Sequence, residues 1–498
     1  MAARRFPPVF FALTRAPGNI FPARCVVLTV KPDRSWRRHR NARIYGAFLC
    51  LSAAASAQAT LTVNSGSLGL MTSPGSTNHI WADASPTNMV FDRWVGNTNV
   101  LADVYAWHTT AVMPTNSAAV TATYKSAPTW PISTNILNGL KPSNPNAIFL
   151  VYYFPTNPAG LIFCFHGTGG SAERIFGNDN VEYYQFLRDS VAAGYAVAAL
   201  DSIDRVTNKQ WSGDSSSTNA DVLNVKASIN YFISLGLMTT NTPKYSTGMS
   251  DGGGFAPKPA YYLGFNACSI WCAAGAPLAA FNVSTVPTIW SLAQNDDLYD
   301  HTTFLQDSQT GMASLAAQHP PVLGELRENT PSPVYPRRFM RIPGFTAAYS
   351  QMIYNDLKNN GFLNAQDYLL TDPNTSGWIN VLPSGFVPYQ SDIEDQLDCC
   401  YTAHQFYSDY NNKVLRFLGA QHPPVAGRDG ISAFNVNTNG TFRLTIAADP
   451  GQAYRVQASS NLVSWSNLFT NSNAAGTFDF SDNAVTNQAR RLYRTVSP

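Results

Sequence analysis

One short segment combines residue types that support nucleophilic chemistry. Gly248-Met-Ser-Asp-Gly252 has the pattern G-x-S-x-G. In this pattern a strand ends, the chain turns sharply and a helix begins, with the serine at the tip of the turn. Gly248 and Gly252 suit that turn because a Cβ at either position would collide with the neighbouring strand or helix. Ser250 is therefore a candidate nucleophile. The motif alone also fits an ordinary turn, so the nucleophile assignment depends on whether the sequence also offers a base, an acid and oxyanion donors.

A serine nucleophile needs hydrogen-bond donors for the oxyanion that forms during acyl transfer. The free N–H groups at the start of the helix after Ser250 are one source, which points to the backbone N–H of Asp251. The other is the glycine-rich loop His166-Gly-Thr-Gly-Gly170, directly after the apolar run 161–165. Gly167 and Thr168 are the expected donors there. His166 is a candidate base as well, although its place beside Gly167 favours a loop-shaping role.

The acid and the base have candidates further along the chain. The apolar run 287–293 breaks into a polar turn that carries Asp296 and Asp297. His404 lies on the loop before the amphipathic segment 407–418, for which we predict a helix that closes the domain. The order serine, aspartate, histidine is the order of triads in α/β-hydrolases. Of the other histidines, 301, 319 and 422 adjoin no equally regular element.

The elements that would position these residues alternate between strands and helices from 133 to 420. Buried-strand runs are expected at 147–154, 161–165, 195–200, 269–274 and 288–292, and helices at 181–193 and 222–237. Such alternation predicts a mostly parallel, doubly wound α/β sheet covered on both faces. Ligands then bind at the carboxyl ends of the strands.

Over about 285 residues the chain resembles an α/β-hydrolase. Its segments HGTGG and GMSDGG are similar to those of exported esterases related to feruloyl esterases, polyhydroxyalkanoate depolymerases or dienelactone hydrolases. Asp251 departs from these families, which often have a small or amide residue after the serine. The resemblance implies a serine esterase with an acyl-enzyme intermediate, no metal and no organic cofactor. The related enzymes often have G-x-x-D at the acid turn, and aligning Ala293 with that glycine selects Asp296, with Asp297 as the alternative.

The flanking segments have a different composition. Residues 60–125 read as a small β module that resembles the B-repeat of the internalins, with Trp94 expected in its core. Residues 126–132 and 421–429 read as linkers, and 430–498 resembles a β-sandwich module of secreted bacterial proteins. The resemblance of these modules implies contact with a polysaccharide or a cell surface. Their fold alone does not show whether they attach the protein to a surface, bind a polymer or only act as spacers.

Residues 1–59 read as a secretory signal region: a basic stretch, an apolar run at 44–55 and Ala57-Gln-Ala59. Without it, 23 basic and 30 acidic residues remain, so nothing in the charge suggests a nucleic-acid partner. The mature chain is expected to be secreted, periplasmic or cell-surface, without a transmembrane segment. Five cysteines remain, for which one or two disulfides and a leftover thiol are expected.

A long segment separates Asp296 from His404, and we expect residues 303–395 to include a cap over the site, or else ordinary helices and loops. His166, Met249, Asp201 and Trp211 are candidate pocket residues, although a loop-capping role for Asp201 is favoured. Substrates would be small or polymeric esters. Two other functions stay open: a serine peptidase or amidase, and a surface binding protein with an inactive hydrolase scaffold.

Overall fold

The structure is a computed structural model that describes residues 59–498 apart from 68, 128, 130–131, 138–147, 178–179, 276–283, 299–300, 320, 422–429, 437–441, 448–453, 461–463, 472–477, 483–490 and 497–498. The described part belongs to one compact unit, 56–498. The predicted signal region lies outside the described residues except for Ala59, where the first strand begins. Among the described residues, no helix is long and apolar enough to cross a membrane.

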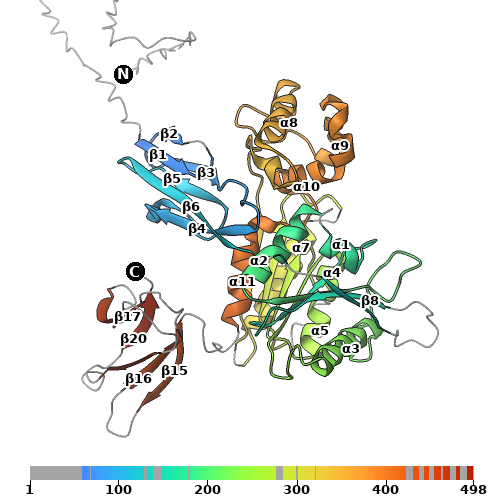
Figure 1. The fold of residues 1–498 in the computed structure, drawn as a ribbon, viewed down its shortest axis with the longest axis vertical. Helices are drawn as coiled ribbons and strands as arrows, with labels where there is room; N and C mark the ends of the chain where they lie inside the picture. Colours follow the sequence, from blue (N-terminus) through green and yellow to red (C-terminus); the bar gives the residue numbers. More distant parts are fainter. Residues whose placement is uncertain are drawn as a thin grey trace, which may run out of the picture. The chain divides into compact units, whose positions relative to one another are not determined.

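The centre of the chain is an eight-stranded sheet with the order β14-β13-β12-β11-β9-β10-β8-β7 (Figure 1). Strands β14 to β10 pair in parallel, and β8 and β7 are antiparallel additions at one edge. The predicted mostly parallel α/β sheet is therefore confirmed. The strands are β7 (Ser133–Leu137), β8 (Ile148–Tyr153), β9 (Leu161–Phe165), β10 (Ala196–Leu200), β11 (Lys244–Met249), β12 (Ala267–Trp271), β13 (Thr288–Ala293) and β14 (Gly324–Asn329).

Helices cover both faces of this sheet. One face packs on a core that includes α3 (Ala220–Ser234) and α5 (Pro257–Tyr262), and the other on a core that includes α2 (Val181–Ala192) and α11 (Asn411–Ala420). Within one strand the side chains alternate: Leu150 of β8 belongs to the first core and Val151 to the second. This alternation explains why the strands read as continuous apolar runs. The shorter helices are α1 (Ala172–Phe176) and α4 (Asp251–Phe255).

The segment predicted as a cap divides into two parts. Its first part belongs to the sheet, because α7 (His301–Ala316) connects β13 to the parallel edge strand β14. The sequence of β14, GELREN, has no apolar run, since an edge strand is buried only in part. The second part is helical, with its own core around Phe339, Ile353 and Leu397. It contains η2 (Arg338–Arg341), α8 (Ala347–Asn359), α9 (Pro373–Ser376), η3 (Trp378–Val381), η4 (Ser384–Tyr389) and α10 (Gln390–Tyr401). We call residues 330–401 the helical segment.

The N-terminal residues form a small all-β module of a four-stranded sheet, β2-β1-β6-β4, and a two-stranded sheet, β3-β5. Trp94 is 1% exposed and donates its indole N–H to the Ala106 carbonyl at 2.9 Å, so it is a core residue as predicted. The elements are β1 (Ala59–Asn64), β2 (Leu70–Thr72), β3 (Thr77–Trp81), β4 (Met89–Gly96), η1 (Thr98–Val100), β5 (His108–Val112) and β6 (Ala118–Ser126).

Aromatic and charged contacts join this module to the helical segment and to η5. Trp81 stacks on Tyr335 with ring centroids 4.4 Å apart. His108 Nδ1 lies 2.9 Å from the Asp409 carboxylate, in the short helix η5 (Ser408–Tyr410), and the fully buried Arg338 reaches the same carboxylate at 3.3 Å. Arg338 and Asp409 are thus buried charges that pair with each other, as buried charges generally do.

The C-terminal residues form two three-stranded sheets, β15-β16-β19 and β18-β17-β20. Leu444 and Ile446 of the first sheet share a core with Val456 of the second, so the two sheets pack on each other. The strands are β15 (Gly430–Val436), β16 (Phe442–Ala447), β17 (Tyr454–Ser459), β18 (Ser466–Asn471), β19 (Phe478–Asp482) and β20 (Leu492–Val496).

Cysteine pairing differs from the expectation. All five described cysteines are buried free thiols: Cys164, Cys268, Cys272, Cys399 and Cys400. Cys164, Cys268 and Cys272 lie in or directly after strands of the central sheet, and Cys399 and Cys400 lie in α10. Both regions bury a large core, so they do not need cross-links to hold them together.

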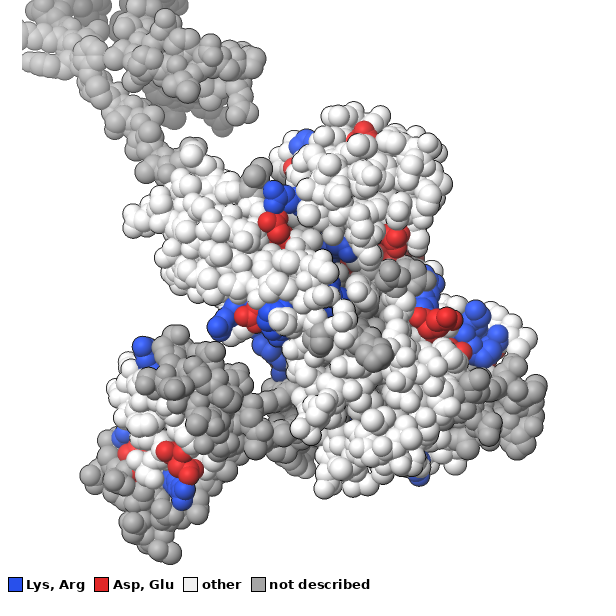
Figure 2. All heavy atoms as spheres, viewed as in Figure 1, with Lys and Arg blue, Asp and Glu red and all other residues white. Residues whose placement is uncertain are grey.

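Charged side chains are sparse on the face drawn in Figure 2, where they lie singly or in small groups of mixed sign. Ion pairs also join different parts of the chain, such as Arg337–Asp83 at 2.5 Å and Arg416–Asp103 at 2.8 Å. Exposed pairs of this kind each stabilise a fold by at most about 1 kcal/mol.

Candidate active site

Ser250 lies at the tip of the turn between β11 and α4. Its backbone has φ 59° and ψ −123°, a conformation that costs a residue with a side chain about 1–3 kcal/mol. The turn is held by its own hydrogen bonds, since Ser250 N–H donates to the Trp271 carbonyl and Gly254 N–H donates to the Ser250 carbonyl, both at 2.9 Å. Ser250 thus stands in a strained position that the surrounding backbone fixes.

The two motif glycines are required by close backbone approach. A Cβ on Gly248 would lie 2.2 Å from the Gly252 carbonyl oxygen, and a Cβ on Gly252 would lie 2.2 Å from the Phe165 carbonyl oxygen. Neither oxygen can move away without displacing the elbow helix or β9. The spacing of the motif is therefore a packing requirement of this turn.

The structure brings Asp296 and His404 together. Asp296 follows β13, His404 follows α10, and His404 Nδ1 lies 2.7 Å from Asp296 Oδ2. The neighbouring Asn295 fixes the two loops to each other: its backbone N–H donates to the Thr402 carbonyl at 3.0 Å and its side chain donates to the Tyr401 carbonyl at 2.7 Å. The pair is almost fully buried, with side chains 11% and 2% exposed for His404 and Asp296. A buried carboxylate in this position holds the imidazole in one orientation and one tautomer.

Asp297, the alternative acid, lies elsewhere. It is exposed, and its carboxyl group interacts with Asp372 of the helical segment. Partial burial and the hydrogen bond to Asp372 raise the pKa of Asp297.

Cys272 adds a third group beside the histidine. It directly follows β12, has φ 46°, and its thiol donates to the Gln405 carbonyl at 3.2 Å. Since β12 lies between β11 and β13, this bond holds the histidine loop to the strand next to Ser250. Sequence analysis missed Cys272 and Asn295, because a thiol after a strand and an amide before an aspartate carry no specific signal.

The same three groups are a potential metal-binding set. One ligand atom each from Cys272, Asp296 and His404 lie within 4.8 Å of one another, and among the described residues no other such group is present. Burial raises the pKa of the Cys272 thiol well above its ordinary value, so the thiol is protonated near neutral pH. With Asp296 already on His404 Nδ1, the arrangement favours a hydrogen-bonded pair of side chains over an ion site.

The glycine-rich loop lies against the serine. A Cβ on Gly167 would be 3.4 Å from the Ser250 Cβ, so the backbone of this loop lies against Ser250. The loop is closed by a Gly170 N–H to Gly167 carbonyl bond of 3.0 Å, and Gly169 N–H donates to the Asn208 carbonyl at 2.9 Å. Gly167 thus lies beside Met249 and Ser250, whereas the Thr168 hydroxyl accepts from the Gln210 amide at 3.4 Å.

His166 is a structural residue of this loop. Its side chain is bonded on both sides, with Nδ1 2.8 Å from the Gly167 carbonyl and Nε2 3.2 Å from the Ser202 N–H, which fits a ring that donates from Nδ1 and accepts at Nε2. Burial lowers its pKa to about 4, so the ring is neutral near pH 7. With both nitrogens used, His166 has the loop-shaping role that its position favoured.

Most of the other predicted pocket residues hold the same loops. Asp201 accepts from the Ala172 N–H at 2.8 Å and pairs with Arg205 at 3.2 Å, as a loop cap does. The Trp211 ring stacks on Phe255 at 4.4 Å and donates to the His166 carbonyl at 2.8 Å. Met249 is buried, with its sulfur near Gly167.

Asp251, at the position where the sequence departs from the esterase pattern, is hydrogen-bonded. Its carboxylate accepts from the Trp211 backbone N–H at 2.7 Å. Burial raises its pKa, and the hydrogen bond from Trp211 and the charge of Lys258 oppose that rise. Asp251 therefore ties the elbow to the loop that supports His166.

Comparison with known proteins gives similarity to solved structures only, since no family model and no curated protein matches. The similar structures include a ferulic acid esterase (10% identity, 40% of this chain and 90% of that chain, TM-score 0.31). They also include brefeldin A esterase, a bacterial homologue of human hormone sensitive lipase (14% identity, 40% and 68%, TM-score 0.29). A third is an S-formylglutathione hydrolase from Agrobacterium tumefaciens (13% identity, 40% and 85%, TM-score 0.29).

Proposed function

We propose that this protein is a serine hydrolase of the α/β-hydrolase kind that cleaves carboxylic esters through Ser250, His404 and Asp296. The observation that carries the proposal is the geometry at one edge of the sheet. A serine on a strained elbow follows β11, and a buried His–Asp pair is anchored to the ends of β12 and β13. Such a combination serves acyl transfer and has no evident structural purpose.

In the proposed reaction, the Ser250 hydroxyl attacks the ester carbonyl while His404 accepts its proton. Asp296 holds the imidazole and stabilises the imidazolium that forms. The backbone N–H groups of Asp251 and of Gly167 or Thr168 stabilise the oxyanion. His404 then protonates the departing alkoxide, and a water molecule activated by the same histidine releases the acid from Ser250. The nucleophile, the base, the acid and the oxyanion donors in this sequence all belong to the chain itself.

Ester cleavage is preferred to peptide cleavage on the chemistry of the leaving group. An amide leaves only when its nitrogen is protonated, whereas an alkoxide is a better leaving group and demands less of the acid. The resemblance of the HGTGG and GMSDGG segments to exported esterases points the same way. A panel of p-nitrophenyl esters from acetate to decanoate, run beside aminoacyl p-nitroanilides, tests the choice. Anilide hydrolysis faster than ester hydrolysis would favour a peptidase.

The helical segment is proposed to shape substrate choice. Its last helix, α10, ends at Tyr401 and leads directly into the His404 loop, so the segment and the base share one stretch of chain. Replacing 345–389 by a short linker should leave the α/β sheet intact and change the preference between short and bulky esters. A folded variant with an unchanged preference would show that the segment is only an elaboration of the surface.

We also propose that the protein acts outside the cytoplasm, on the basis of the signal-like sequence of residues 1–59 and its two β modules. Expression of the full chain in a bacterial host, followed by N-terminal sequencing of the protein in the periplasm and medium, tests this. Processing near Ala59 is the expected result. Retention of an unprocessed chain in the cytoplasm would contradict it.

A further inference from the structure

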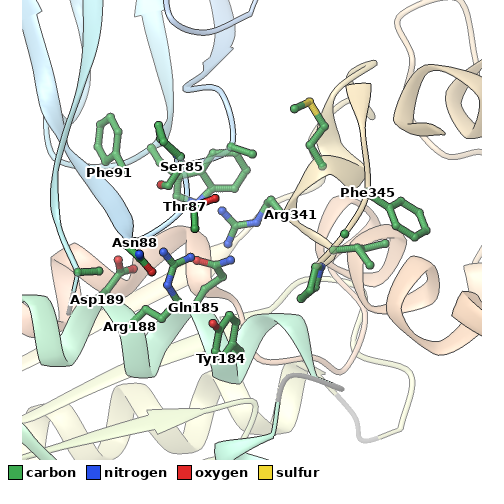
Figure 3. Close-up of a pocket in the computed structure, with 18 of the residues that line it drawn as sticks. Ser85, Thr87, Asn88, Phe91, Tyr184, Gln185, Arg188, Asp189, Arg341 and Phe345 are labelled. Carbon is green, nitrogen blue, oxygen red and sulfur yellow. The ribbon is translucent and has the colours of Figure 1, made fainter. Parts of the chain in front are cut away.

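A large cavity lies away from Ser250, Asp296 and His404. It has a volume of about 650 Å³, within the range of small-molecule sites. Three parts of the chain form its wall: the loop 83–88 of the N-terminal module, the exposed side of α2, and residues 340–345 of the helical segment. Figure 3 shows Gln185 and Arg188 rising from α2 toward Thr87 and Asn88 of the module, with Arg341 entering from the helical segment.

The wall offers donors of several kinds. Arg188 donates to the Met89 carbonyl at 2.5 Å, and Arg341 donates to the Ser408 hydroxyl. A guanidinium carries five N–H donors, so each arginine keeps donors beyond these bonds. Gln185 and Asn88 add amide groups.

The wall also offers an acceptor, and its charges balance. Asp189 lines the cavity and accepts from the Asn411 amide at 2.8 Å, which leaves lone pairs on its carboxyl group. Glu182, fully buried, lies 3.8 Å from Arg341 Nε. The cavity itself is lined by two acids, Asp83 and Asp189, and two arginines, Arg188 and Arg341, so it gives an anion little net attraction. The chemistry favours a neutral ligand whose groups both donate and accept hydrogen bonds.

Aromatic rings complete the wall. Phe91 and Trp107 come from the module, Tyr184 from α2, and Phe345 from the helical segment. The Arg341 guanidinium lies 4.0 Å from the centroid of Trp107, which fixes it in place. Phe91 and Trp107 are buried, so Tyr184 and Phe345 are the partly exposed rings of the four. Flat rings beside hydroxyl, amide, carboxyl and guanidinium groups match a pyranose ring, which has apolar C–H faces and an edge of hydroxyls.

We propose that this cavity binds a neutral oligosaccharide, held between the N-terminal module, α2 and the helical segment. The proposal is independent of the ester chemistry at Ser250. It gives the module a function that its fold alone could not supply, because the module contributes one wall of the site.

Isothermal titration calorimetry of the Ser250→Ala full-length protein tests this, with xylohexaose and cellohexaose as neutral probes and trigalacturonate as the anionic probe. Thr87 is exposed at the cavity, so Thr87→Trp should fill the space without disturbing a core. Gln185→Ala removes one amide. The matched controls are Thr115→Trp, exposed on the same module, and Gln351→Ala, exposed on α8.

We expect one neutral hexasaccharide to bind per protein, at least tenfold more weakly in Gln185→Ala and not measurably in Thr87→Trp. Both controls should bind as the parent does. No binding of either neutral probe up to about 10 mM, binding unchanged by Thr87→Trp, or binding of trigalacturonate alone would each overturn the proposal. Hydrolysis of p-nitrophenyl acetate by the Thr87→Trp enzyme with Ser250 intact should be unchanged, which separates this test from that of the ester chemistry.

Discussion

Replacing Asp296 with asparagine should reduce ester turnover by about three orders of magnitude. The carboxylate lies 2.7 Å from His404 Nδ1, and both side chains are almost fully buried. When His404 takes the serine proton, its positive charge lies about 4 Å from the carboxylate charge, worth about 4 kcal/mol at the effective dielectric of protein sites. At 1.36 kcal/mol per tenfold change in rate, this loss corresponds to about 10³ in kcat.

The assay is the steady-state hydrolysis of p-nitrophenyl butyrate, with the melting temperature measured in parallel. Asp297→Asn is the matched control, since the Asp297 side chain is exposed and interacts with Asp372. It should change kcat by less than about threefold. If folded Asp296→Asn keeps more than about a third of the parental kcat, or if Asp297→Asn is the variant that loses activity, the assignment of the acid is wrong.

Two further predictions concern stability. Gly252→Ala places a methyl group 2.2 Å from the Phe165 carbonyl oxygen and 2.6 Å from that of His166, so urea unfolding should show a loss of about 3 kcal/mol or more; a loss below 1 kcal/mol would contradict the close approach. His79 has its pKa lowered to about 4 by burial and by the neighbouring His108. The unfolded chain therefore binds a proton below about pH 6.5 that the folded chain does not, and stability should fall as the pH drops from 6.5 to 4. Between pH 7 and pH 4.5, the free energy of unfolding should fall by about 1–3 kcal/mol more in the parent protein than in His79→Gln. Equal falls in the two proteins would refute the lowered pKa of His79.

The turn that carries Ser250 could be predicted from the sequence because the residues that it requires are close together in the chain. Gly248 and Gly252 are spaced by the contacts of a single turn, and any chain that makes this turn needs them. The alternation of apolar runs and helices likewise predicted the sheet, since each buried strand carries its own signal. The position of Ser250 follows from these local rules alone.

Other features depend on contacts between distant residues. Asp296 and Asp297 are neighbours in one turn, and only the approach of His404, 108 positions later, distinguishes them. The helix α10 was not predicted, because its buried side includes Asp395 and Asp398, which resemble surface residues in the sequence. Burial raises the pKa of Asp398 to about 8, a property that no local pattern reveals.

The cavity beside α2 could not be predicted for the same reason. Its wall joins residues near positions 85, 188 and 341, which no periodicity connects. Polar residues such as Gln185 and Arg188 read as the solvent-exposed side of an amphipathic helix. Only the packing of the module and the helical segment turns that side into a cavity wall.

Covalent labelling of Ser250 tests the central claim most directly. The full-length protein is incubated with a fluorophosphonate probe, digested and analysed by mass spectrometry. We expect one adduct per chain, on Ser250, absent in Ser250→Ala and formed at least 100-fold more slowly in folded His404→Ala. A folded protein that is not labelled, or one labelled equally fast without His404, would contradict the proposed catalytic site.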